Sequence, residues 1–83
     1  MAHAVEVKRV TVEVKTFPGL GKRIKNARES DPRSLSQICR EAEISRGYWY
    51  QLENEELLSP ATEEIIRKVE AALGVDLKVS FGE

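Results

Sequence analysis

The sequence predicts a mainly α-helical fold: a bundle of four to five helices with short β-strands at the N- and C-termini. Apolar residues recur at helical spacing through the middle of the chain, whereas β-branched and apolar residues alternate with polar ones at both ends. The chain has 83 residues, of which 41% are hydrophobic, which suits one small core. We therefore expect an N-terminal β-strand arm (1–18), a helical domain (19–75) and a C-terminal β-strand (76–83).

The N-terminal arm is rich in valine. The valines occupy odd positions before Lys8-Arg9 and even positions after this pair, and Pro18-Gly19 ends the stretch. Because side chains alternate between the two faces of a strand, this change of phase indicates either a bulge or two short strands.

The C-terminal end alternates between apolar and polar residues over positions 75–81, the pattern of a half-buried strand. A lone strand leaves its backbone groups unpaired, so we expect the two terminal strands to pair with each other. The pairing can be made within one chain or across a homodimer. We expect it to form the dimer.

The interior of the chain is predicted to be helical. Pro60 helps to start the last helix and Gly74 ends it. The expected helices are 20–29, 34–42, 45–54 and 61–73.

The second and third of these helices are short and follow each other closely. Ser34 suits an N-cap, and Gln37 three residues later completes the pattern of a capping box. Only Glu43-Ile44 then separates the second helix from Ser45, which caps the third. Two short helices with such a connection form a helix-turn-helix, in which the second helix can enter a DNA major groove.

Residues 20–75, about two thirds of the chain, resemble the helix-turn-helix domain of the lambda repressor, Cro and xenobiotic-response-element regulators. The resemblance implies a fold and a DNA-binding function of that family. It is carried by Leu20-Gly21-Lys22-Arg23-Ile24, Arg28-Glu29, Ser34-Leu35, Ile44-Ser45, Tyr48-Trp49-Tyr50-Gln51-Leu52-Glu53-Asn54, Pro60 and Ala72-Leu73-Gly74-Val75.

By this resemblance, Ser45 belongs to the DNA-binding residues as the cap of the recognition helix, and Arg46, Gly47 and Gln51 lie where family members touch base edges. Arginine suits a guanine and glutamine suits an adenine, each through two hydrogen bonds in the major groove. Gly47 lets the backbone come close but offers no side chain. Tyr48 and Tyr50 are expected to contact phosphates or a thymine methyl group.

Other polar residues are expected to contact the DNA backbone. A phosphate would be held at the start of the second helix, and less specific contacts would come from the first helix. The expected residues are Ser34, Ser36, Gln37, Lys22, Arg23 and Lys25.

Several of these residues also have purely structural interpretations. Arg46 and Gln51 can be solvated helix residues, Trp49 fits the core, and Arg28 and Glu53 fit a structural pair between the first and third helices. Cys39 stands where the family prefers alanine, so we interpret it as a small packed residue. Glu43 stands where many relatives have glycine, which predicts strain in the turn.

Charge is unevenly distributed along a chain whose net charge is −1. Residues 20–30 carry four basic side chains against one acidic side chain, whereas residues 55–83 carry seven acidic against three basic. Phosphate contact depends on the charge of the touching face. Glu55-Glu56 follows the third helix, where relatives often have glycine and basic residues, so modest and salt-dependent DNA affinity is expected.

The patterns of several other protein classes are missing from the sequence. It shows no catalytic dyad, metal-ligand spacing or phosphate-binding loop, so we expect no enzyme activity, metal or cofactor. No membrane-spanning run is present, and the single cysteine is typical of the cytoplasm. We expect a cytoplasmic homodimer that binds double-stranded DNA as a transcriptional regulator, most simply a repressor. The alternative is an antitoxin or accessory module that docks on a protein partner; activator function stays open.

Overall fold

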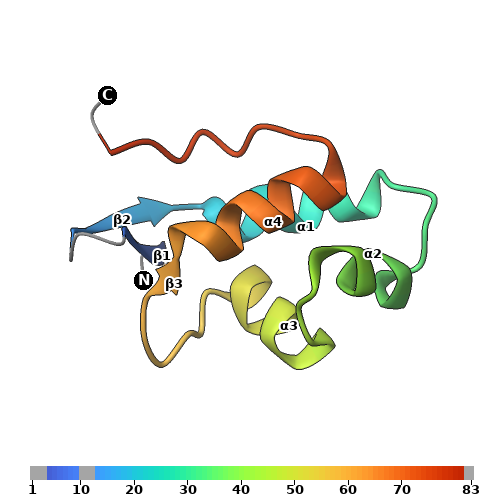
Figure 1. The fold of residues 1–83 in the computed structure, drawn as a ribbon, viewed down its shortest axis with the longest axis horizontal. Helices are drawn as coiled ribbons and strands as arrows, with labels where there is room; N and C mark the ends of the chain where they lie inside the picture. Colours follow the sequence, from blue (N-terminus) through green and yellow to red (C-terminus); the bar gives the residue numbers. More distant parts are fainter. Residues whose placement is uncertain (1–3, 10–12, 82–83) are drawn as a thin grey trace.

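The computed structural model, which describes residues 4–9 and 13–81, combines a small sheet with four helices (Figure 1). The strands are β1 (Ala4–Lys8), β2 (Val14–Pro18) and β3 (Ala61–Thr62). The helices are α1 (Leu20–Glu29), α2 (Leu35–Ala42), α3 (Arg46–Asn54) and α4 (Glu63–Leu73). The expected mainly α-helical bundle with separate terminal strands is therefore wrong, because a three-stranded mixed sheet is part of the body of the fold.

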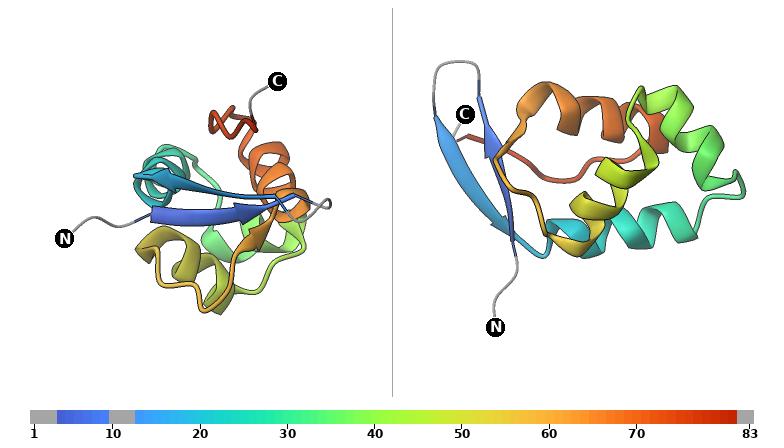
Figure 2. Two further views of the ribbon diagram at one scale, coloured as in Figure 1. Left: turned by 90° about the vertical axis from the view of Figure 1, so that its left-hand side faces the viewer. Right: turned by 90° about the horizontal axis from the view of Figure 1, so that it is seen from below.

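The sheet has the strand order β2-β1-β3, with β1 in the centre. β1 and β2 are antiparallel, with Val5 opposite Phe17, whereas β1 and β3 are parallel, with Val7 opposite Ala61. The change of phase in the valine pattern thus reflects two strands rather than one bulged strand. Figure 2 shows the sheet at one end of the helical body, where Val5, Val7 and Phe17 are buried.

The predicted C-terminal strand is also wrong, and within one chain this segment does not pair with the N-terminal arm. Residues 75–81 run beside α1 and α4 (Figure 1), but the structure assigns them to no strand, and Lys78 interrupts the extended backbone with a positive φ of 62°. Residues 82–83 of the predicted strand, and residues 1–3 and 10–12 of the predicted arm, lie outside the described part of the chain. The second edge of β1 is occupied instead by β3, a segment predicted to be the start of a helix.

Side chains from the body of the protein bind the backbone of residues 75–81, which we call the C-terminal segment. Arg23 donates to the carbonyl oxygen of Leu77 at 3.2 Å, and Leu77 N–H donates to Glu70 at 2.8 Å. Further along, the Val79 and Ser80 carbonyl oxygens accept from Arg67 and Lys15. These bonds satisfy backbone groups of the segment without a neighbouring strand and hold it against the body of the protein.

The alternation in the C-terminal segment correctly indicated the burial of its last three apolar residues, whereas the first, Val75, is 38% exposed. Leu77, Val79 and Phe81 are buried, and the ring of Phe81 packs edge to face against Phe17 with centroids 6.1 Å apart. The segment therefore closes the side of the core opposite α3.

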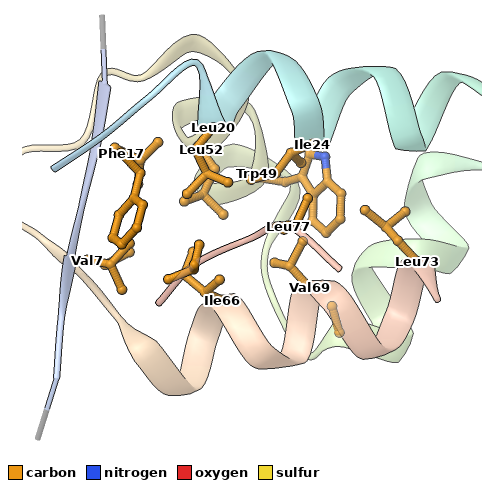
Figure 3. Packing of buried hydrophobic residues seen from close by; sticks show 14 of the residues in the cluster. Val7, Phe17, Leu20, Ile24, Trp49, Leu52, Ile66, Val69, Leu73 and Leu77 are labelled. Carbon is orange, nitrogen blue, oxygen red and sulfur yellow. The ribbon is translucent and has the colours of Figure 1, made fainter. Parts of the chain in front are cut away.

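The core is a single cluster shared by the sheet, all four helices and the C-terminal segment (Figure 3). Trp49 is fully buried at its centre, among Ile24 of α1 and Leu77 of the C-terminal segment. Cys39 is buried as predicted, and this burial raises the pKa of its thiol. Within the described residues, no helix is long and apolar enough to cross a membrane.

Candidate nucleic-acid interface

The candidate interface begins with the connection between α2 and α3. Ser34 accepts a hydrogen bond from Gln37 N–H at 3.1 Å, and Ser45 accepts one from Tyr48 N–H at 3.2 Å. The two serines are therefore N-caps, as predicted. Between the helices, Glu43 takes the left-handed conformation (φ 59°), and Ile44 N–H bonds back to Cys39. This closes α2 and turns the chain directly into α3.

The inner side of α3 is fixed by two donor side chains that meet at one carboxylate. Glu53 accepts from Arg28 of α1 through both its oxygens, at 2.5 and 3.0 Å, and from the indole N–H of Trp49 at 2.7 Å. The Glu53 side chain is only 3% exposed. The structural pairing of Arg28 with Glu53 is confirmed, and it holds α3 in one rotation about its axis.

The backbone of α1 also touches α3 directly. A Cβ added to Gly21 would lie 2.5 Å from the carbonyl oxygen of Glu53 and 2.6 Å from that of Leu52. Only glycine therefore fits at position 21. The glycine contact and the Glu53 cluster together determine which face of α3 points away from the body.

The outward face of α3 carries the residues that the sequence assigned to base contacts. Gly47, Tyr50 and Gln51 are exposed at helical spacing on the side opposite Trp49 and Leu52. Arg46 is exposed at the start of the same helix. Figure 2 shows α3 from below, between α1 and α4, on the side of the molecule opposite the C-terminal segment.

Arg46 is linked to α2 by one hydrogen bond. Its guanidinium donates to the hydroxyl of Ser36 at 3.4 Å. Ser36 and Gln37 are both exposed in the first turn of α2, next to the Ser34 cap. The residues predicted to meet a phosphate and the residue predicted to meet a base thus form one continuous polar surface over the two helices.

Two predicted contact residues are placed differently from the others. Tyr48 is half-buried and packs against the core, and this burial raises the pKa of its hydroxyl. Arg23 bonds to the carbonyl oxygens of Pro18 and Leu77, so its guanidinium serves the fold. Lys22 and Lys25 of α1 are exposed.

Glu55 does not act as the exposed negative charge that the sequence suggested. It is the left-handed C-cap of α3, and its carboxylate accepts from Gly21 N–H at 3.3 Å. Since α1 has no acidic residue in its own first turn, Glu55 supplies the negative charge that favours a helix N-terminus. Glu56 remains exposed beside it.

One residue of this surface was missed from the sequence. Asn54 is exposed in the last turn of α3, three residues after Gln51 and seven after Gly47, and so lies on the same face. Its amide can both donate and accept hydrogen bonds. The spacing could have revealed it, since position 54 continues the row formed by positions 47 and 51.

The chain matches no protein-family model, no curated protein and no solved structure in the three comparisons. The candidate interface is therefore defined by its own geometry. It consists of α3, which is held in place by α1 and has a polar outward face, and of α2, which Ser34 caps.

Proposed function

We propose that the protein is a sequence-specific DNA-binding transcriptional regulator, most simply a repressor, that inserts α3 into the major groove. The observation that carries the proposal is the division of α3 into two faces. Trp49, Leu52 and Glu53 fix the inner face, whereas the side chains of Tyr50 and Gln51 make no hydrogen bond to the described residues. Tyr50 is 49% exposed, so its ring and hydroxyl are accessible to a molecule that approaches this face.

The chemistry of this outward face suits base edges better than a protein core. Arg46 offers paired donors for a guanine, and Gln51 offers a donor and an acceptor for an adenine. Asn54, which can bind adenine in the same way, extends the row. Ser36 and Gln37 lie where α2 would approach a phosphate, and Lys22 and Lys25 add charge from α1.

The proposal includes a homodimer on a two-fold symmetric site. One helix-turn-helix contacts few base pairs, and two-fold symmetry is the usual way to gain affinity and specificity. The half-sites would be spaced by about one turn of DNA, roughly 34 Å. A cytoplasmic location belongs to the same proposal, because Cys39 is a lone thiol and DNA is the ligand.

The test is selection from random double-stranded DNA, followed by titration of the selected site at several salt concentrations. Arg46→Ala and Gln51→Ala should each weaken binding by about 1–3 kcal/mol and relax preference at separate base positions. Lys78→Ala is a matched control, because it removes an exposed charge from the C-terminal segment on the opposite side. Failure to enrich any sequence at low salt, with folded protein, would contradict the proposal.

A second candidate function is docking on a protein partner, as an antitoxin or accessory module does. One observation favours it: Leu58, in the loop between α3 and β3, is 99% exposed and follows the exposed acid Glu56. Leu58→Asp discriminates between the two candidates. It should abolish partner binding if this loop is the docking site, and it should leave the base preferences of α3 unchanged.

A further inference from the structure

Strand β2 forms one edge of the sheet, and its outer side has no neighbour among the described strands. Figure 2 shows β2 on the far side of β1 from α3. Edge strands expose backbone groups that can pair with another chain, and proteins often protect them with a bulge, a proline or charged side chains. In β2 a proline stands only at the last position, Pro18, whose carbonyl oxygen accepts from Arg23. The backbone before Pro18 therefore remains available for pairing.

One hydrogen bond of the hairpin shows which backbone groups of β2 point outward. Arg9 N–H donates to the Glu13 carbonyl oxygen at 2.8 Å, so these two opposite residues form a hydrogen-bonded pair. Such pairs alternate along an antiparallel ladder, which directs the backbone groups of residues 13, 15 and 17 toward β1. The N–H and C=O groups of Val14 and Thr16 therefore point away from β1. Within the described residues they have no hydrogen-bond partner.

The side chains of this edge carry charges of both signs around one apolar residue. Glu13 and Lys15 are exposed on one face, and Val14 between them is 46% exposed on the other face. The Glu13 carboxylate makes no ion pair or hydrogen bond within the described part of the chain. The Lys15 ammonium donates to the Ser80 carbonyl oxygen at 3.1 Å, which leaves it further donors. A complementary strand would place a base opposite Glu13 and an acid opposite Lys15.

A second copy of β2 is such a strand in only one register. In a two-fold symmetric antiparallel pair, one residue faces its own copy on the axis. Glu13 or Lys15 on the axis would place like charges opposite each other, which is destabilising. With the axis at Thr16 or beyond, Pro18 of the partner subunit would face open groups of β2 without an N–H to donate. These registers are therefore disfavoured.

The register with Val14 on the axis avoids both problems. The two valines exchange backbone hydrogen bonds, and their exposed side chains contact each other. Glu13 of each copy then lies opposite the partner's Lys15, which forms two ion pairs. We propose that two copies of this chain associate through an antiparallel β2–β2 pair centred on Val14, which joins their sheets into one. This inference rests on the proposed function for the expectation of a homodimer, and it names the surface that forms it.

Charge exchange at two positions tests the register. Sedimentation equilibrium at low salt, without DNA, gives the dissociation constant of the dimer. Glu13→Lys replaces both ion pairs by pairs of lysines and should raise this constant about tenfold, because each cross-strand pair changes from attraction to repulsion. Lys15→Glu should have the same effect. The double variant Glu13→Lys/Lys15→Glu restores opposite charges across the axis and should return the constant to within about twofold of wild type.

The matched control is Glu6→Lys, the same charge reversal at an exposed position of the central strand β1. It should leave the dissociation constant of the dimer at the wild-type value. Thermal unfolding followed by circular dichroism shows whether each variant is folded. If Lys15→Glu unfolds because it loses the bond to Ser80, Glu13→Lys decides the test, since the Glu13 side chain has no partner within the described residues.

The outcomes separate this inference from the proposed function. A chain that stays monomeric at every concentration, or a dimer that Glu13→Lys leaves unchanged, would overturn the β2–β2 pair. So would a double variant that dimerises no better than Glu13→Lys alone. Base recognition by α3 would stand in each case, because selection of DNA tests it independently. A dimer that follows the charge exchange, without selection of any DNA sequence, would overturn DNA binding and support the β2–β2 pair.

Discussion

The indole N–H of Trp49 donates to Glu53 one turn later in α3, and the same carboxylate oxygen accepts from Arg28 of α1. A buried tryptophan, a buried carboxylate and a half-buried guanidinium therefore satisfy one another, and within the described residues no buried side-chain nitrogen or oxygen lacks a partner. This cluster orients the candidate interface without belonging to it.

Replacing Glu53 by alanine should lower the free energy of unfolding by about 3–5 kcal/mol. The change leaves the Arg28 charge and the Trp49 N–H without their acceptor in a buried place. Glu53→Gln should cost less, because its amide oxygen can still accept from Trp49. Urea unfolding followed by circular dichroism measures both variants. If both variants lost the same free energy of unfolding, the hydrogen bond from the Trp49 indole to Glu53 would make no contribution of its own to stability.

Replacing Gly21 and Gly47 by alanine should change the free energy of unfolding in opposite directions. Gly21→Ala should lower the free energy of unfolding by about 1–3 kcal/mol, since its Cβ would overlap backbone oxygens that cannot move cheaply. Gly47→Ala should raise it by at most about 0.5–1 kcal/mol, since its Cβ enters open space in the first turn of α3. Thermal unfolding compares the two variants, and a change of the same sign in both would contradict the close contact of α1 with α3.

Two glutamates in the left-handed conformation should differ when each is replaced by glycine. Glu43→Gly should raise the free energy of unfolding by about 0.5–1 kcal/mol, because glycine takes this conformation without steric cost and the lost ion pair with Lys68 is exposed. Glu55→Gly should raise the free energy of unfolding less, since it also removes the carboxylate that accepts from Gly21 N–H. Urea unfolding measures both variants. An equal increase in the free energy of unfolding at both positions would argue against a stabilising hydrogen bond from Gly21 N–H to Glu55.

The C-terminal segment should be part of the folded core although it pairs with no strand. Leu77→Ala should lower the free energy of unfolding by about 2–5 kcal/mol, because Leu77 is 2% exposed and lies against Trp49. Leu58→Ala makes the same chemical change at an exposed position and should stay within about 0.5 kcal/mol of wild type. Chemical unfolding that leaves Leu77→Ala near wild type would mean that the segment is loosely held.

Acid should weaken the contact between the α1–α2 connection, which contains Asp31 and Arg33, and the end of α4. Hydrogen bonds from Arg33 lower the pKa of Asp31 from its ordinary 3.8 to about 2, and Arg33 also donates to the Ala72 carbonyl oxygen at the end of α4. A lowered pKa in the folded state contributes stability above pH 3.8 that is lost as the pH falls through about 2. Stability measured from pH 5 to 2 should therefore fall less steeply in Asp31→Asn than in wild type. If the stability of the two proteins fell equally steeply with decreasing pH, Asp31 would not contribute to the acid sensitivity.

Much of the helical part could be predicted because its signals are local. Ser34 and Ser45 cap the two helices as expected, and α1 begins and ends where the periodicity placed it. The exposure of Arg46, Gly47, Tyr50 and Gln51 follows from the same spacing. The role of Glu55 could not be predicted, because Gly21, which donates to it, is 34 residues away in the chain.

The sequence by itself determined the β-strand character of the N-terminal arm, the four helices with the serine caps of α2 and α3, and the burial of Leu77, Val79 and Phe81 in the C-terminal segment. All of these depend on the spacing of neighbouring side chains. Only the tertiary structure decided that β3 rather than the C-terminal segment pairs with β1, that Arg23 binds the backbone of the C-terminal segment, and that Tyr48 packs partly against the core. Those outcomes depend on competition between partners distant in sequence, because one strand edge or guanidinium can satisfy only a few groups at once.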